Sequence, residues 1–348
     1  KVLAVLLCAA MVMSMTACGN SSTEEPAETA DTTEAADDST EAADESSDAA
    51  AAGGDFKIGL VTDVGGVNDG SFNQSAWEGL QRAAEELGVE ANYLESSTDA
   101  DYTPNLETFI DEEYDLIISV GYMLADATKA AAEANPDVKF AIIDDATIEL
   151  DNVTCLMFEQ EQGSYLVGYV AGMMTETDNV GFVIGMSNEN MNLFGYGYCA
   201  GVLDANPDAT IQQFNVNSFA DSATGKSMAN TAITNGADIV FHAAGASGLG
   251  VIEACQEAGV YAIGVDSDQS SIAPETVITS AMKRVDNAVY DSVEALINGT
   301  LEGGVVTYDL SMGGVDIAPT QDLLPEEVIS AVEDVKQQII DGEIVVPN

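Results

Sequence analysis

The chain has 348 residues, with 60 acidic side chains against 9 basic ones and a formal net charge of −51. Such a charge repels phosphate backbones and anionic membrane surfaces, which argues against nucleic-acid binding. The single histidine, His242, excludes a multi-histidine metal centre. The hydrophobic content of 46% nevertheless predicts that most of the chain folds around a core.

Residues 1–17 have the composition of a secretion signal. Lys1 precedes an apolar run from Val2 to Met13, which is shorter than the roughly 20 apolar residues of a permanent membrane span. The run leads into Met15-Thr16-Ala17-Cys18, which resembles a bacterial lipobox, where the cysteine is lipidated and becomes the new N-terminus. We therefore expect a lipid on Cys18; an ordinary signal peptide with an incidental cysteine is the alternative.

Residues 18–54 read as an acidic linker that follows the lipidated cysteine. After Cys18 the segment consists almost wholly of Ser, Thr, Ala, Gly, Asp and Glu, with eleven acids and no base. It cannot bury enough apolar surface to offset the entropy of ordering. As a flexible coil it would span roughly 30–35 Å, which suits a tether that holds a domain away from a membrane.

Residues 55–348 alternate strand-like apolar runs with amphipathic helical patterns, as in the helix predicted from Phe72 to Leu87. This alternation predicts an α/β fold with parallel sheets covered by helices on both faces, and the length suits two cores. Ligands of such sheets bind outside the carboxyl ends of the strands. Strands are expected at Lys57–Thr62, Ala91–Leu94, Leu116–Val120, Lys139–Ile143, Thr154–Phe158, Val180–Ile184, Thr210–Phe214, Ile239–His242, Tyr261–Val265 and Val277–Ser280.

The loop after the first strand is the most informative segment. Gly65 and Gly66 allow a tight turn, and Asp69 or Ser71 can cap the helix that follows. The free amides at this helix start favour an acceptor atom on a ligand. Phe72 in the first helical turn is either a core residue, which periodicity favours, or an aromatic platform that faces a cleft.

Other candidate motifs are better explained by structural roles than by catalysis or cofactor binding. Asp144-Asp145 at a strand end is better explained as a loop carboxylate lining the cleft or capping a helix than as an acid–base or metal pair. His242 lies in an apolar strand and is interpreted as a buried, hydrogen-bonded histidine. Gly245-x-x-Gly248-x-Gly250 has the wrong order for a dinucleotide fingerprint and is interpreted as a close-approach turn. Three cysteines of this region are expected to be core residues, with one disulfide possible: Cys155, Cys199 and Cys255.

A series of motifs resembles the basic membrane protein (Bmp) lipoproteins, the purine nucleoside receptor A type of substrate-binding protein, over residues 56–345. One segment departs from the family pattern, because Gly185–Asn192 replaces a more usual Gly-Gly run followed by a proline. The matching motifs are Asp63-x-Gly-Gly-x-x-Asp69-x-Ser71-Phe72-Asn73-Gln74-x-x-Trp77-x-Gly79, Phe140-Ala-Ile-Ile-Asp144, Gly163-x-x-x-x-Gly168-x-x-Ala171-Gly172, Ser218-Phe219-Ala220-Asp221, Ala243-Ala244-Gly245 and Gly264-Val265-Asp266-x-Asp268-Gln269, followed by Lys283-Arg284.

The resemblance implies a type I periplasmic-binding-protein architecture of two Rossmann-like lobes that close on a ligand. The first lobe would comprise residues 55–158 and 286–310, and the second residues 159–285 and 311–348. Three hinge crossovers would lie near Glu159, Val285 and Leu310. The resemblance also implies transport without catalysis, cofactor or metal: a lipoprotein on the outer face of a bacterial cell membrane would deliver a nucleoside, with purines favoured, to the permease of an ABC transporter.

The resemblance further implies a base stacked between Phe72 and Phe219, with Phe214 as the alternative to the second ring. First-lobe polar groups would bind the base edge, and second-lobe groups the ribose. The candidate ligand-binding residues are Asp63, Asn68, Asp69, Phe72, Asn73, Asp144, Phe219, Gly245, Asp266 and Lys283.

The residue chemistry fits a neutral nucleoside. Aromatic rings suit a flat base and a carboxylate such as Asp266 suits a ribose diol, while the negative charge of the domain disfavours a phosphorylated ligand. Lys283 is one of eight bases after residue 54; it either serves the cleft or pairs with surface acids. Two alternatives stay open: a receptor of the same fold for a sugar or signalling compound, and a nucleoside hydrolase, which the missing nucleophile–base pair disfavours.

Overall fold

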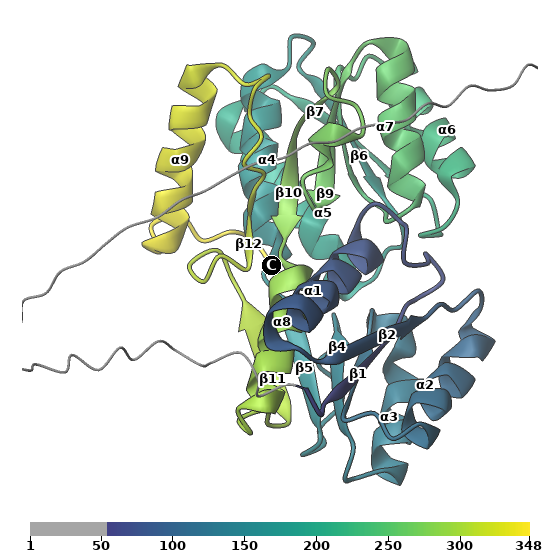
Figure 1. Ribbon diagram of the computed structural model, residues 1–348. Coiled ribbons are helices and arrows are strands. Elements are labelled where there is room, and N and C mark those ends of the chain that lie inside the picture. The colour runs from purple at the N-terminus through teal and green to yellow at the C-terminus, as the bar shows by residue number, and fades with distance from the viewer. Residues whose placement is uncertain (1–53) are drawn as a thin grey trace, which may run out of the picture. The chain divides into compact units, whose positions relative to one another are not determined.

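The structure is a computed structural model and describes residues 54–348 (Figure 1). The predicted signal peptide, the lipidated Cys18 and the acidic linker lie outside the described residues. Within residues 54–348 the chain builds two six-stranded sheets, each with helices on both faces. The predicted α/β fold with parallel sheets is therefore confirmed.

The first sheet has the strand order β11-β5-β4-β3-β1-β2, and all of its pairings are parallel. On one face α1 (Phe72–Leu87) packs against α8 (Val285–Ile297), and α2 (Tyr102–Asp111) packs beside α3 (Ala125–Ala134) on the other (Figure 1). The strands are β1 (Lys57–Val61), β2 (Glu90–Leu94), β3 (Leu116–Ser119), β4 (Lys139–Ile143), β5 (Val153–Phe158) and β11 (Gly304–Tyr308). We call this sheet with its four helices the first lobe.

The second sheet has the order β12-β10-β9-β8-β6-β7, and only the pairing of β12 with β10 is antiparallel. Its strands are β6 (Asn179–Ile184), β7 (Thr210–Asn215), β8 (Ile239–Ala243), β9 (Tyr261–Asp266), β10 (Val277–Lys283) and β12 (Val315–Ile317). Its helices are α4 (Gln160–Met174), α5 (Glu189–Ala205), α6 (Ser222–Thr234), α7 (Ser247–Ala258) and α9 (Glu326–Ile340). We call this sheet with its five helices the second lobe.

The chain passes between the lobes at three places. It leaves the first sheet after β5 and enters α4, returns after β10 into α8, and crosses again between β11 and β12. The residues at these crossings are Glu159, Arg284 and the segment 309–314. These three short connections between the lobes are the elements that would absorb a hinge motion.

All ten predicted strands are present. Their ends differ from the prediction by at most one residue, except that β10 continues three residues beyond Ser280 to Lys283. The strands β11 and β12 were not predicted. In β11 the side chains of Val305 and Val306 are exposed, so the segment carries no alternation of buried and exposed residues. β12 has only three residues, which is too short for a periodic pattern.

Glycines let α4 and α5 approach closely. A Cβ atom at Gly197 would lie 2.0 Å from the carbonyl oxygen of Glu161, and one at Gly201 would lie 2.1 Å from that of Tyr165. The N-terminus of α5 is capped by Asn188, whose side chain accepts a hydrogen bond from the backbone of Met191. The first turn of α5 therefore lies at the carboxyl end of the second sheet, beside the candidate site.

Candidate ligand-binding site

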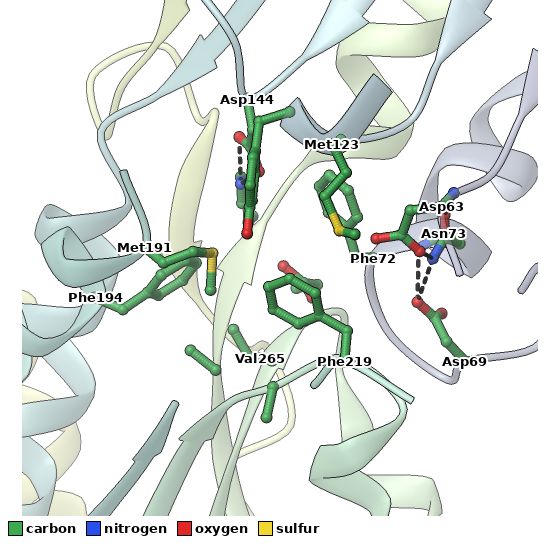
Figure 2. A pocket seen from close by; sticks show the side chains of 17 residues that line it. Asp63, Asp69, Phe72, Asn73, Met123, Asp144, Met191, Phe194, Phe219 and Val265 are labelled. Carbon is green, nitrogen blue, oxygen red and sulfur yellow. Dashed lines mark hydrogen bonds and ion pairs between the residues drawn. The ribbon is translucent and has the colours of Figure 1, made fainter. Parts of the chain in front are cut away.

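A cavity with an empty volume of about 510 Å³ lies between the carboxyl ends of the two sheets. Figure 2 shows aromatic and methionine side chains around its middle and carboxylates at its borders. The first lobe contributes Asp63, Asp69, Phe72, Asn73, Gly121, Tyr122, Met123 and Asp144; the second contributes Met191, Phe194, Phe219, Ala243, Ala244, Gly245, Val265, Asp266 and Lys283.

A hydrogen-bonded network of Asp63, Asn73 and Asp69 forms one border of the cavity (Figure 2). The Asn73 side-chain nitrogen donates to Asp63 Oδ1 at 2.7 Å and to Asp69 Oδ2 at 3.0 Å. Asp63 Oδ1 also accepts from the backbone of Gly65 at 2.8 Å. No described residue donates a hydrogen bond to Asp63 Oδ2, so this oxygen can accept a hydrogen bond from a ligand.

Asp69 acts mainly as the cap of α1. Its carboxylate accepts from the backbone nitrogens of Ser71, Asn73 and Gln74 at 2.9, 2.9 and 3.0 Å, which satisfies otherwise unpaired amides of the first turn. Burial nevertheless raises the pKa of Asp69 above its usual value, and burial raises the pKa of Asp63 to about 6. The capped turn fixes the position of Phe72 and Asn73.

Phe72 and Phe219 approach the cavity from opposite lobes (Figure 2). Both side chains are half-buried and pack against the core as well, so Phe72 belongs to the core and also lines the cavity. A Cβ atom at Gly185 would lie 2.5 Å from the Phe219 ring, and one at Gly245 would lie 3.5 Å from Phe219 Cβ. Phe214, the alternative second ring, lines a different groove, between α5 and β7.

Lys283 is the cation of the cavity, and only 1% of the residue is exposed. Its ammonium group lies 2.6 Å from both carboxylate oxygens of Asp144, so a surface role is excluded. The same nitrogen lies 5.0 Å from the ring centroids of Phe72 and Phe158 and 5.6 Å from that of Phe194. The ion pair joins the end of β10 in the second lobe to the loop after β4 in the first.

Asp266 has a different environment from Asp144. Its carboxylate accepts from the hydroxyl of Ser71, across the lobes, and burial raises its pKa to about 7 although the charge of Lys283 opposes the shift. Asp144 and Asp266 have φ angles of 66° and 65°, a left-handed conformation that is unfavourable for most residues and concentrates at functional sites.

Nine of the ten residues predicted as ligand contacts line the cavity, and Asn68 does not. Asn68 is exposed on the loop between Val67 and Asp69. Among the residues that sequence reasoning missed are Tyr122 and Met123 after β3, and Met191 and Phe194 on α5. Their position after a strand end was the only indication in the sequence. Met191 also lies in the segment Gly185–Asn192, which departs from the family pattern, so no motif pointed to it.

Three further expectations concern side chains outside the cavity. The described cysteines are free; Cys155 and Cys255 are core residues as predicted, whereas Cys199 is only partly buried. His242 is buried, and its Nε2 is paired with Gln269 at 3.0 Å, while its Nδ1 has no partner among the described residues. Among residues 54–348 there is no group of three or more His, Cys, Asp or Glu side chains suited to a metal ion.

None of the described helices combines the length and apolar character needed to cross a bilayer.

Comparisons with known proteins agree with the fold. A CD4+ T-cell-stimulating antigen of Listeria monocytogenes is 40% identical over 315 residues, covering 84% of this chain and 88% of that protein. The ABC transporter nucleoside-binding protein BmpA of Lactococcus lactis is 36% identical over 316 residues, covering 84% and 90%. A solved ABC transporter solute-binding protein of Aeropyrum pernix superposes with a TM-score of 0.77 at 29% identity, covering 84% and 94%.

These similarities extend across both lobes rather than over one of them. Residues 56–348 match the family described as ABC transporter substrate-binding protein PnrA-like. The sequence-based resemblance is thus confirmed, and the chain belongs to the Bmp family of PnrA-like substrate-binding proteins of ABC transporters.

Proposed function

We propose that this chain binds a nucleoside, with purines favoured, between its lobes and delivers it to the permease of an ABC transporter. The observation that carries the proposal is the pairing of two phenylalanines from opposite lobes with carboxylate and amide groups at the borders of one cavity. The printed name of the Lactococcus lactis relative, a nucleoside-binding protein, supports the same ligand class.

The base would stack between Phe72 and Phe219, where each contact contributes on the order of 1–3 kcal/mol. Asp63 and Asn73 lie where they could bind the edge of the base, with Asp69 holding the helix turn that carries Asn73. Asp266 would accept from the ribose hydroxyls and Lys283 would donate to the sugar, beside Gly245. The residues that line the cavity include several carboxylates and one cation. This charge balance suits an uncharged ligand better than a phosphate.

The location of the protein is part of the same proposal. A lipid on Cys18 would anchor the chain to the outer face of the cell membrane, with residues 19–54 as the tether. Mass spectrometry of the protein from a bacterial membrane fraction should find a diacylglyceryl group on Cys18, and the Cys18→Ser variant should appear in the soluble fraction. A wild-type chain with an unmodified Cys18 would contradict the anchor.

Isothermal calorimetry tests the ligand class directly. Inosine, guanosine, adenosine, cytidine and uridine should be titrated into the chain, with ribose and galactose as sugar controls. We expect saturable binding of at least one purine nucleoside and none of the free sugars. Binding of a sugar alone would favour a sugar receptor, and release of free base after long incubation would favour a hydrolase.

Two alanine variants test the role of the rings. Phe219→Ala should weaken nucleoside binding by about 5- to 150-fold, because one stacking surface is lost. Phe214→Ala is the matched control, since this ring lines a different groove, and it should leave the affinity within about twofold. Equal losses in both variants would contradict stacking on Phe219.

A further inference from the structure

Gln269 is a buried side chain that contacts both lobes and has no place in the proposed binding of base or sugar. It begins the short 3-10 helix that follows β9, and only 1% of the residue is exposed. Its side-chain nitrogen donates to the carbonyl oxygen of Gly70 at 2.8 Å. Gly70 belongs to the first lobe, directly before Ser71 and the first turn of α1.

The second lobe fixes the orientation of the Gln269 amide. Gln269 Oε1 accepts from the backbone nitrogen of Val265 at 3.0 Å and lies 3.0 Å from His242 Nε2. The backbone of Gln269 is held in turn by the hydroxyl of Ser280, at 3.1 Å. A backbone N–H can only donate and a backbone carbonyl can only accept, so the amide must present its nitrogen to Gly70.

Two glycines and the only histidine of the chain support this arrangement. A Cβ atom at Gly264 would lie 2.6 Å from Gln269 Oε1, and one at Gly248 would lie 2.1 Å from the His242 ring. Burial lowers the pKa of His242 to about 4, so the ring is neutral at pH 7 and donates from Nε2 to the amide oxygen. His242 and the turn at Gly248 thus hold the Gln269 side chain in place.

The hydrogen bond to Gly70 can exist only when the lobes are together. It acts on the loop that places Phe72 and Asn73, because these residues follow Gly70 and Ser71 directly. A Cβ atom at Gly70 would lie 3.2 Å from Leu249 of the second lobe, so the two surfaces are packed at this point. We propose that Gln269 is a positioning residue that latches the Gly70 loop to the second lobe and slows reopening of the cleft.

A latch of this kind affects dissociation more than association. The bond contributes to the closed state and not to the open one, so its loss shifts the closed–open equilibrium toward opening. The ligand enters the open cleft, so the association rate should not change, whereas the dissociation rate should increase. Loss of one neutral hydrogen bond should raise the dissociation rate constant by about 2- to 12-fold.

Gln269→Glu is the selective variant. Its ionised carboxylate retains an oxygen for Val265 and His242 but replaces the donor that faces Gly70 with a second acceptor. Gln256→Glu is the matched control, because it makes the same chemical change on an exposed position of α7 in the same lobe. If Gln269→Glu does not fold, Gln269→Met removes the donor without adding a charge.

The experiment rests on the proposed function for its ligand and uses stopped-flow kinetics on the full chain with the nucleoside that calorimetry identifies. We expect the dissociation rate constant of Gln269→Glu to rise by about 2- to 12-fold with an association rate constant within about twofold of wild type. Gln256→Glu should match wild type in both. A dissociation rate within twofold of wild type, or an equal increase in the control, would overturn the latch.

One further measurement tests the latch without a variant, and another tests it without a ligand. In wild-type protein, the Gln269 side-chain amide protons should exchange more slowly with ligand than without it, and equal exchange rates would overturn the proposal. If no nucleoside binds, the proposed function fails, and the latch is tested by small-angle scattering of the ligand-free chains. Gln269→Glu should then have a larger radius of gyration than wild type, and equal radii would overturn it.

Discussion

The ends of β1 and β6, which occupy corresponding positions in the two lobes, differ in their chemistry. The sheets share one strand order, in which β1, β3 and β4 correspond to β6, β8 and β9. After β1 the first lobe places Asp63 with its hydrogen-bonded network, whereas after β6 the second lobe places Gly185, which makes room for the Phe219 ring. At this pair of strand ends the first lobe thus offers hydrogen-bonding groups and the second makes room for an aromatic ring, which suits a flat ligand with polar edges.

The carboxylates that follow β4 and β9 sharpen the comparison. Asp144 and Asp266 have nearly equal positive φ angles, but Lys283 contacts Asp144 directly, whereas Asp266 is paired with a neutral hydroxyl. A direct cation partner stabilises an ionised carboxylate, and burial without one disfavours it. We infer that Asp144 holds the lysine in place, while Asp266 stays available to accept hydrogen bonds from a ligand.

The largest expected effect comes from removing the cation of this pair. Lys283→Met leaves Asp144 buried without a partner and should lower the free energy of unfolding by about 3–5 kcal/mol, measured by urea denaturation. The double variant Lys283→Met/Asp144→Asn should recover most of that loss, because no unpaired charge remains and Asn tolerates the left-handed conformation. A single-variant loss below about 1 kcal/mol would show that the pair is not the buried contact described above.

The next effect is a pH dependence that belongs to Asp266. With a pKa of about 7 in the free chain, Asp266 is mostly protonated at pH 5.5 and mostly ionised at pH 8. If only the ionised form accepts from the ribose, calorimetry should find affinity falling by up to about 30-fold from pH 8 to pH 5.5. Asp266→Asn should bind weakly with a flatter pH profile, and a wild-type affinity that rises on acidification would contradict this role.

Stability of the ligand-free chain should respond to pH in the opposite sense. The folded-state pKa values of Asp63 and Asp266 lie above the usual value of 3.8, so the folded chain takes up protons before the unfolded chain does. The contribution of these two carboxyls to the free energy of unfolding should therefore increase as the pH falls from 8 toward 4. The Asp63→Asn/Asp266→Asn variant should lose this increment in urea denaturation, and an unchanged pH profile would contradict it.

A smaller effect should follow from adding one methyl group in the second lobe. The Cβ atom of Gly185→Ala would clash with the Phe219 ring, which should displace the ring, cost about 1–3 kcal/mol of stability and weaken nucleoside binding about tenfold. Gly185→Ala/Phe219→Leu should recover stability in thermal denaturation but not affinity in calorimetry. Recovery of both would show that Phe219 is not a platform for the ligand.

The smallest effect is expected at Asn68, the predicted contact that faces solvent. Asn68→Ala should change affinity by less than about twofold, as is typical of surface substitutions. Asn73→Ala is the matched comparison, because it breaks the bonds to Asp63 and Asp69, and calorimetry should find a larger loss. A loss at Asn68 equal to that at Asn73 would mean that the loop rearranges around the ligand.

The sequence predicted those parts of the molecule that depend on local pattern. Apolar runs located the ten strands, and strand ends drew attention to Asp144 and Lys283, because parallel strands bring their carboxyl ends to one edge. The family motifs located Asp63 and Asp266. It could not predict the partner of Lys283, since Asp144 is 139 residues away in the chain. Family motifs located Phe219, but only packing against Gly185 and Gly245 distinguishes it from Phe214.

Residues such as Met191 and Phe194 were missed for a physical reason. They lie on a helix whose apolar positions also serve the core, and periodicity does not separate a side chain that lines a cavity from one that fills a core. Likewise the Gln269 contact with Gly70 joins residues 199 positions apart. Such contacts follow from the way the lobes meet, which no local pattern encodes.

A crystal structure of the chain grown with inosine would test the central claim most directly. We predict that the base lies between Phe72 and Phe219, with a base-edge atom within hydrogen-bond distance of Asp63 or Asn73 and ribose hydroxyls bonded to Asp266. A ligand bound elsewhere, or a base in the cavity that touches neither ring, would contradict it.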